Sequence, residues 1–247
     1  ADLAETLVKA GVEIEKKNIR IPGNTIKRLG KYEAKVRFHR DVEVDFGFEI
    51  VPDAASIKAA EEAANAAKIL GISSRENLKL KDGFLNNSED YQLKIVEKIR
   101  KYKPEIVLAN AIDDRHPDHA KAAKLVSDAC FLSGLKKIET FDNDQPQEVW
   151  RPKHIFHYIQ WKNVVPEFVI DISGFMEQKI EACLAYKTQF YNPESKEPVT
   201  PIATKDFLES LTYRAQDLGR LSGVDYAEGF TTEKLIALKN FDGIICG

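Results

Sequence analysis

The first fifty residues contain two runs in which polar and apolar side chains alternate. Residues 32–38 and 42–51 repeat with a period of two, as strands with one buried face do. Ahead of them, residues 1–10 have the pattern of a short amphipathic helix that ends at Gly11, and residues 18–21 are strand-like. The pattern predicts a small α+β lobe whose sheet is largely antiparallel.

The pattern changes after Pro52. Alanine-rich residues 56–70 predict a helix that ends at Gly71. Beyond it we expect helices at 88–102, 119–132, 175–186 and 205–218, and strands at 77–80, 105–109, 155–159 and 168–172. Strands that alternate with helices are typical of a Rossmann-like, doubly wound α/β fold with a mostly parallel sheet. We therefore expect a lobe at residues 1–53 and a second domain at residues 56–247.

The composition suits a folded protein. The chain is 43% hydrophobic and 30% charged, and no uncharged apolar window of about 18 residues predicts a transmembrane helix. Its first residues lack the basic and apolar regions of a secretory signal, and the absence of an initial Met suggests a processed chain or a fragment. Three widely spaced cysteines, Cys130, Cys183 and Cys246, form neither a disulfide framework nor a CxxC pair. These features predict a cytoplasmic protein.

Charge is unevenly distributed at the N-terminal end. Residues 20–40 contain seven basic residues and one acid, whereas residues 41–53 contain five acids and no base. The net charge of −3 excludes a globally basic nucleic-acid binder but permits a local basic patch.

The densest polar cluster, Asp-Asp-Arg-His-Pro-Asp-His at residues 113–119, follows the predicted strand at 105–109 and begins a helix. Ligands bind at the carboxyl ends of strands in open α/β sheets. His116 and His119, three residues apart in a first helical turn, can face one cleft, with Asp118 orienting one imidazole. This arrangement suits one histidine as a metal ligand and the other as a partner for an oxyanion. The alternative is a helix-capping loop with solvated charges.

Residues 109–119, Ala-Asn-Ala-Ile-Asp-Asp-Arg-His-Pro-Asp-His, resemble the LmbE/PIG-L family of zinc-dependent N-acetylglucosamine deacetylases. The bacillithiol-biosynthesis branch, which deacetylates N-acetylglucosaminyl-malate, is the most similar. Segments 75–78, 82–84, 124–130, 168–172, 187–191 and 226–230 also resemble that branch in order, so the resemblance extends from about Ile57 to the C-terminus.

The resemblance implies roles for particular residues. It makes His119 a zinc ligand, His116 the histidine that stabilises the oxyanion, and Asp118 the carboxylate that holds His116. Arg115 resembles a substrate-contacting arginine and suits the malate carboxylates, and Phe207 stands where the family pattern has a tyrosine. The resemblance further implies Zn²⁺ as cofactor and hydrolysis of a linear amide bond in a small N-acetylglucosaminide, and it permits a homo-oligomer, which is common in the family. From the composition we expect no membrane partner.

A second motif of the family is absent from these 247 residues. Its first strand ends in Ala-His-Pro-Asp-Asp, which supplies two zinc ligands and the general base. His39 and Asp41 stand at matching offsets, but Val42 occupies the place of the second ligand, so an ordinary exposed strand is the preferred interpretation. Because zinc-dependent hydrolysis needs three protein ligands, we expect impaired activity and leave open whether the chain is an active enzyme.

The N-terminal block resembles the C-terminal lobe of the bacterial large-subunit ribosomal protein L9. The similar segments are residues 11–17, 26–36 and 38–42. This resemblance implies rRNA binding, with Lys27, Arg28, Lys35 and Arg37 as phosphate-contacting residues. A solvated charged sheet face is the alternative.

Three hypotheses follow for a chain that joins two incomplete pieces near residues 54–57. The first is an impaired deacetylase, the second an rRNA-binding module on an inert α/β body, and the third a chimera with no function as a unit.

We also expect that the N-terminal strands do not replace the missing first strand, because their alternation suits a half-exposed sheet. His154 and His157 should point to opposite faces of one strand, and Trp150 and Trp161 should serve in packing or in an interface.

Overall fold

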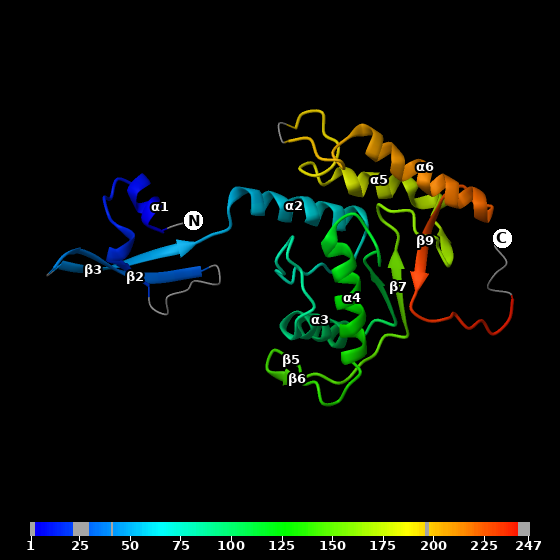
Figure 1. Cartoon of the computed structure of the whole chain (residues 1–247), viewed down its shortest axis with the longest axis horizontal. Coiled ribbons are helices and arrows are strands. Elements are labelled where there is room, and N and C mark those ends of the chain that lie inside the picture. Colours follow the sequence, from blue (N-terminus) through cyan, green and yellow to red (C-terminus); the bar gives the residue numbers. More distant parts are fainter. Residues whose placement is uncertain (1–2, 22–29, 41, 196–197, 242–247) are drawn as a thin grey trace. The chain divides into compact units, whose positions relative to one another are not determined.

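The computed structural model describes residues 3–21, 30–40, 42–195 and 198–241, and the chain forms two compact units, Ala1–Ala63 and Ala64–Gly247 (Figure 1). The boundary falls within a long helix, α2 (Ala54–Ile69), so the sequence-based division at residues 53–56 stays a prediction. None of the helices in the described ranges combines enough length with an apolar sequence to span a lipid bilayer.

The smaller unit is the expected α+β lobe. It contains α1 (Leu3–Lys9), a 3₁₀ turn η1 (Lys16–Asn18) and an antiparallel sheet in the order β1 (Ile19–Arg20), β2 (Gly30–His39), β3 (Val42–Ile50). The buried apolar side chains of these elements are Ala4 and Leu7 of α1 and Ala34 and Val36 of β2. The alternation of residues along β2 therefore predicted both the strand and its buried face.

The larger unit has a mixed four-stranded sheet with helices on both faces (Figure 1). The strands are β4 (Ile106–Ala109), β7 (His154–Tyr158), β8 (Phe168–Asp171) and β9 (Ala227–Thr232), and the helices are α3 (Glu89–Tyr102), α4 (Pro117–Leu132), α5 (Met176–Leu184) and α6 (Lys205–Ser222). Two further pieces are the β5–β6 hairpin (Phe141–Asp142 and Gln145–Pro146) and a 3₁₀ turn η2 (Ser173–Phe175). The α/β class is confirmed.

The strand order is β4-β7-β9-β8, and only β4 and β7 pair in parallel. The sheet is mixed: β4, β7 and β8 run in the same direction, and β9 inserts antiparallel to both of its neighbours. The sequence patterns did not predict β9, whose central Glu228 and Gly229 interrupt any apolar run. Conversely, residues 77–80 form no strand, because the sheet offers them no neighbour to pair with.

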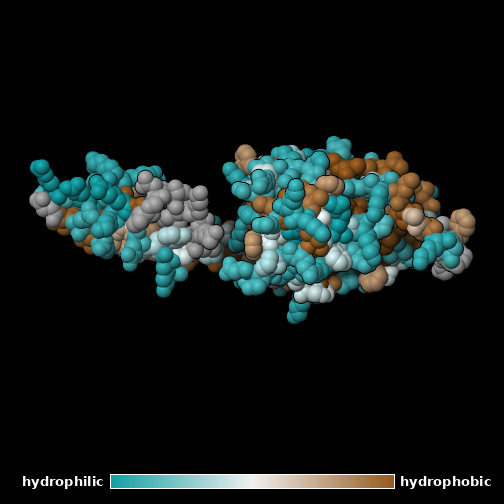
Figure 2. Space-filling model, turned by 90° about the horizontal axis from the view of Figure 1, so that it is seen from below, coloured by the Kyte–Doolittle hydropathy of each residue, from teal (hydrophilic) through white to brown (hydrophobic). Residues whose placement is uncertain are grey.

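Strand β4 lies at an edge of this sheet. Within the described residues, β2 and β3 belong to a separate sheet, so the expectation that they do not replace the missing strand is confirmed. Val107 and Ala109 of β4 pack on the α3–α4 side, whereas Ile106 and Leu108 on the other face are more than half exposed. Apolar side chains also reach the surface of this unit in Figure 2. A strand of this composition is typically covered on both faces, so in the described chain β4 presents an uncovered apolar face.

A buried arginine joins α3 to the segment that follows α4. Arg100 is 3% exposed and donates hydrogen bonds to the carbonyl oxygens of Ser133, Leu135 and Ile138 and to the Thr140 hydroxyl, at 2.7–3.0 Å. It lies beside the apolar cluster of Val96, Ile99, Ala129 and Cys130. One guanidinium thus bonds to four buried or half-buried acceptors at once.

Replacing this guanidinium should destabilise the domain strongly. Arg100→Met keeps the apolar stem but removes all four hydrogen bonds of the guanidinium, and we expect a loss of about 3 kcal/mol in the free energy of unfolding. Urea denaturation measures it. Arg220→Met, at an exposed pair with Asp217, is the matched control and should change stability by no more than about 0.5 kcal/mol. Equal losses in the two variants would contradict the role of Arg100.

The segment before α3 is attached by Glu76. Hydrogen bonds from Lys98 and Tyr102 lower the pKa of its carboxyl group from 4.5 to about 2. Because the pKa of this carboxyl group is lower in the folded state than in the unfolded state, the ionised group stabilises the fold at pH values above its unfolded pKa. This contribution disappears as the pH falls from about 4.5 towards 2. The stability difference between the wild type and Glu76→Gln should therefore shrink over that range, as urea midpoints at each pH will show. A difference that stays constant with pH would exclude this linkage.

Candidate functional site

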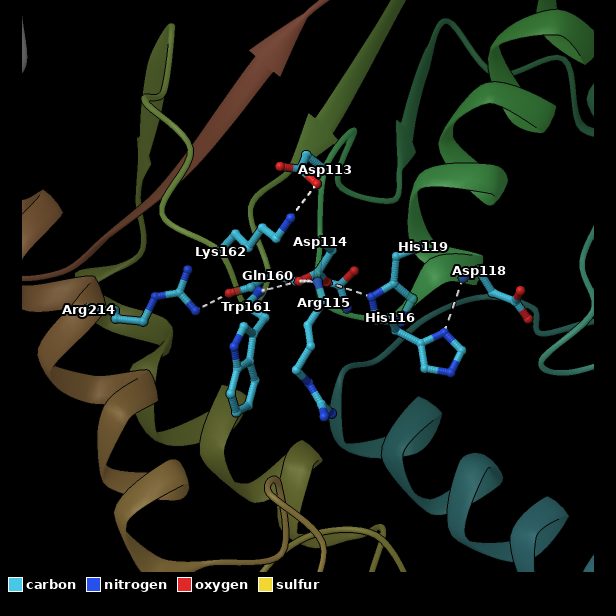
Figure 3. Close-up of polar contacts among 10 residues, drawn as sticks. All are labelled: Asp113, Asp114, Arg115, His116, Asp118, His119, Gln160, Trp161, Lys162 and Arg214. Carbon is cyan, nitrogen blue, oxygen red and sulfur yellow. Dashed lines mark hydrogen bonds and ion pairs between the residues drawn. The ribbon is translucent and has the colours of Figure 1, made fainter.

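The predicted histidines come together where β4 ends and α4 begins (Figure 3). His116 is the N-cap of α4, and its Nδ1 accepts a hydrogen bond from the backbone N–H of Asp118 at 3.2 Å. Pro117 occupies the first helical turn, where its missing N–H costs nothing. The rings of His116 and His119 lie 5.0 Å apart, so the pair faces one place as the spacing predicted.

A carboxylate that sequence reasoning missed orients His119. Asp114 Oδ2 lies 2.6 Å from His119 Nδ1, and its side chain is 1% exposed. Its Oδ1 accepts the backbone N–H groups of Arg115 and Trp161. Burial by itself raises the pKa of Asp114, but the hydrogen bond with His119 and those from the backbone outweigh it and keep the pKa below its usual value. The ionised carboxylate therefore holds the Nδ1 proton and leaves Nε2 as the free ring nitrogen of His119.

Nothing in the sequence distinguishes Asp114 from its neighbour Asp113. Both follow the buried strand, but Asp113 is exposed and pairs with Lys162 at 2.7 Å. The difference depends on which of two adjacent side chains turns inward, and that is set by the loop that packs against them. Asp114 is recognised as a residue of the site only in the structure, where its buried carboxylate lies beside the His119 imidazole.

Asp118 makes a different contact from the one expected. Its backbone N–H, not its carboxylate, bonds to His116. The carboxylate accepts the backbone N–H of Leu85 at 3.3 Å and lies 3.6 Å from Lys121 Nζ. A residue two positions after the N-cap presents its N–H to the capping side chain, so its own side chain turns away. Asp118 thus ties the segment at Leu85 to the start of α4.

Arg115 extends over an aromatic wall. Its guanidinium carbon lies 4.6 Å from the ring centroid of Trp161, and the Trp161 indole stacks on Phe207 of α6 at 5.5 Å with an angle of 13° between the rings. Phe207 in turn lies 6.1 Å from Phe190. Trp161, expected only in packing or in an interface, is therefore part of the site.

These residues line a cavity of about 680 Å³ on the face of the sheet that α5 and α6 cover. Its charged groups are Arg115, Arg214, Lys179, Asp114 and Glu228, with Lys179 and Glu228 paired at 2.5 Å. Arg214 donates to the main-chain oxygen of Gln160, and burial lowers the pKa of its guanidinium. Cations thus outnumber carboxylates in the cavity.

His154 and His157 point to opposite faces of β7, as expected. His157 is buried, with Nδ1 2.8 Å from the carbonyl oxygen of Asn110 and Nε2 3.0 Å from Glu233 Oε1. It joins the end of β4 to the chain after β9. His154 stacks on Phe156 instead.

The residues present do not fit a catalytic zinc ion. In the part of the chain that the structure describes, no three His, Cys, Asp or Glu side chains converge on a position for a metal. His119 offers one nitrogen and His116 a second, whereas catalytic zinc takes three protein ligands and a water. His39 is an exposed residue of β2 in the other unit, and Asp41 lies outside the described residues.

The basic run of the smaller unit is offset by acids across the β2–β3 hairpin. The register places Lys35 opposite Asp45 and Arg37 opposite Glu43. Lys35 Nζ lies 3.5 Å from Glu43 and 3.7 Å from Asp45, and the Arg37 guanidinium donates to the carbonyl oxygens of His39 and Arg40. The other two candidates, Lys27 and Arg28, lie outside the described residues.

Comparisons with known proteins find two kinds of relative. The family model "PIG-L: GlcNAc-PI de-N-acetylase" matches residues 23–130. The chain is 30% identical to the conserved protein TT1542 from Thermus thermophilus, with a TM-score of 0.65 over 76% of this chain and 79% of that one. It is 28% identical over 213 residues to the diacetylchitobiose deacetylase of Thermococcus kodakarensis, over 84% of this chain and 75% of that protein.

The ribosomal similarity is stronger but short. The large ribosomal subunit protein bL9 of Christiangramia forsetii is 60% identical over 53 residues, which are 22% of this chain and 36% of that protein. This chain thus spans only about a third of the bL9 protein. The chain carries a segment similar to bL9. By its family match and by its similarity to these relatives, it belongs to the PIG-L/LmbE family of deacetylases.

Proposed function

We propose that the cavity binds an N-acetylated glucosaminide of the N-acetylglucosaminyl-malate type, and that this chain is an impaired member of the zinc-dependent deacetylases. The observation that carries the proposal is the Asp114–His119 pair beside His116 at the wall of the cavity. Two imidazoles side by side can contact one acetyl amide, and Arg115 can contact an anionic aglycone.

The chain's own groups account for binding and orientation. Asp114 fixes the His119 ring and the N-cap contact fixes the His116 ring, whose Nδ1 accepts the Asp118 N–H so that its Nε2–H can donate a hydrogen bond to an amide oxygen. A zinc ion would supply an activated water in this family, but His119 and His116 are too few ligands to retain it. We therefore propose that ligand binding survives and hydrolysis does not.

Acetate release from N-acetylglucosaminyl-malate with added Zn²⁺ tests this proposal. We expect the wild type to be no faster than His119→Ala, because no residue of the described chain completes a water-activating metal site. Asp113→Asn, at an exposed neighbouring carboxylate, is the control for folding and should match both. Zinc-dependent turnover that disappears in His119→Ala would show an intact enzyme and refute the proposal.

A second candidate function is favoured by the 60% identity to bL9, namely rRNA binding by the smaller unit. The pairing of Lys35 with Glu43 and Asp45 reduces the charge that this strand can offer to phosphates. If the unit binds rRNA, the contacts should therefore depend on Lys27 and Arg28 more than on Lys35.

Salt-dependent binding to a large-subunit rRNA fragment tests this second candidate. Lys27→Glu with Arg28→Glu should weaken binding and reduce the slope of log K against log salt by about 1.4–1.8, the value for two lost phosphate contacts. Lys35→Glu should have a smaller effect. Binding that none of these substitutions changes would exclude the ribosomal function.

A further inference from the structure

A stack of three side chains, Arg115, Trp161 and Phe207, forms one wall of the cavity (Figure 3 labels the first two). The indole of Trp161 is the middle layer, with the Arg115 guanidinium over its ring and the Phe207 ring stacked nearly parallel to it. Stacking on an indole uses the flat face of a guanidinium and leaves its in-plane N–H groups free.

No other group in the described chain satisfies those N–H groups. The Arg115 guanidinium has no hydrogen bond or ion pair there, although the other cations of the cavity do: Lys179 pairs with Glu228, and Arg214 donates to the Gln160 carbonyl. A guanidinium with free donors, held against a cavity wall that also carries Arg214, is suited to a carboxylate, which it binds through two parallel hydrogen bonds.

The backbone fixes the indole relative to the histidines. The N–H of Trp161 donates to Asp114 Oδ1 at 3.2 Å, and the other oxygen of the same carboxylate holds His119. On either side, Arg214 donates to the oxygen of Gln160 and Lys162 pairs with Asp113. The position of the indole, and through it that of Arg115, is therefore set by the carboxylate that orients His119.

We propose that Trp161 is a positioning residue that determines specificity: it holds Arg115 so that the cavity prefers a glycoside with a carboxylate on its aglycone. The inference rests on the proposed function only in taking a glucosaminide as the ligand. Without the indole, the long Arg115 side chain has no partner in the described chain and many conformations, so a carboxylate must order it on binding.

Isothermal titration of the full chain with three probes tests this inference: N-acetylglucosaminyl-malate, neutral methyl N-acetylglucosaminide, and malate alone. The wild type should bind the anionic glycoside at least about tenfold more tightly than the neutral one. Trp161→Ala and Trp161→Leu should each weaken binding of the anionic glycoside more than binding of the neutral one and so lose most of that preference, whereas Trp161→Phe should retain most of it. Trp161→Leu keeps apolar volume at this position but removes the ring on which Arg115 stacks, so it tests the inference if Trp161→Ala does not fold.

Two further comparisons separate positioning from a general structural role. Arg115→Ala should lose the preference too, and the double variant with Trp161→Ala should lose no more than Arg115→Ala alone, because both changes remove one interaction. Phe131→Ala is the matched control, since Arg151 lies over the Phe131 ring at 4.5 Å in a stack outside this cavity. It should leave both affinities unchanged.

The outcomes distinguish the inference from the proposed function. Equal weakening of both glycosides by Trp161→Ala and Trp161→Leu, additive losses in the double variant, or a wild type without anionic preference would overturn the inference while leaving glucosaminide binding in place. If the wild type binds neither glycoside but binds malate in a manner that depends on both Arg115 and Trp161, the proposed function fails and the positioning role stands. Binding of none of the three probes would overturn both.

Discussion

The buried carboxylate of Asp114 is the group on which the whole site depends. One of its oxygens holds the His119 imidazole, and the other accepts the N–H groups of Arg115 and Trp161. A carboxylate with a 1% exposed side chain must have such partners, since an unpaired buried charge is strongly destabilising. Because Asp114 needs these partners, it joins the loop after β4 to the segment after β7. The same carboxylate thereby orients the His119 ring and holds the backbone of Trp161.

The domain that carries this carboxylate is open on one side. Strand β4 has an unpaired edge within the described chain and two exposed apolar side chains, Ile106 and Leu108, and Leu108 also lines the cavity. The unpaired edge strand thus leads directly into the loop that carries His116 and His119. Hydrogen bonds such as those of Arg100 hold the α3–α4 face together, while no three metal-ligating side chains converge among the described residues.

Local patterns predicted the elements whose signals lie within a few residues. The period-two runs became β2 and β3, Ser88 caps α3 and Gly11 adopts the positive φ of a helix terminator, because alternation, caps and stops act over one or two turns. Local patterns failed at two segments: they predicted a strand at residues 77–80, where there is none, and they did not predict β9. Whether such a segment is a strand depends on a neighbouring strand, and that neighbour is distant in sequence or absent.

By itself, the sequence determined that His116 and His119 would face one place, because residues three apart in a first helical turn always do, and that two different family segments share the chain. Only the tertiary structure decided that the carboxylate of Asp114 orients His119. Asp114 and Trp161 are 47 residues apart, and neither the burial of Asp114 nor the stack of Arg115 on Trp161 exists until β4 and β7 pair and bring their loops together. Charge and packing across that distance cannot be read from local spacing, which is why the sequence assigned Asp118 the role of holding His116 and offered no partner for His119.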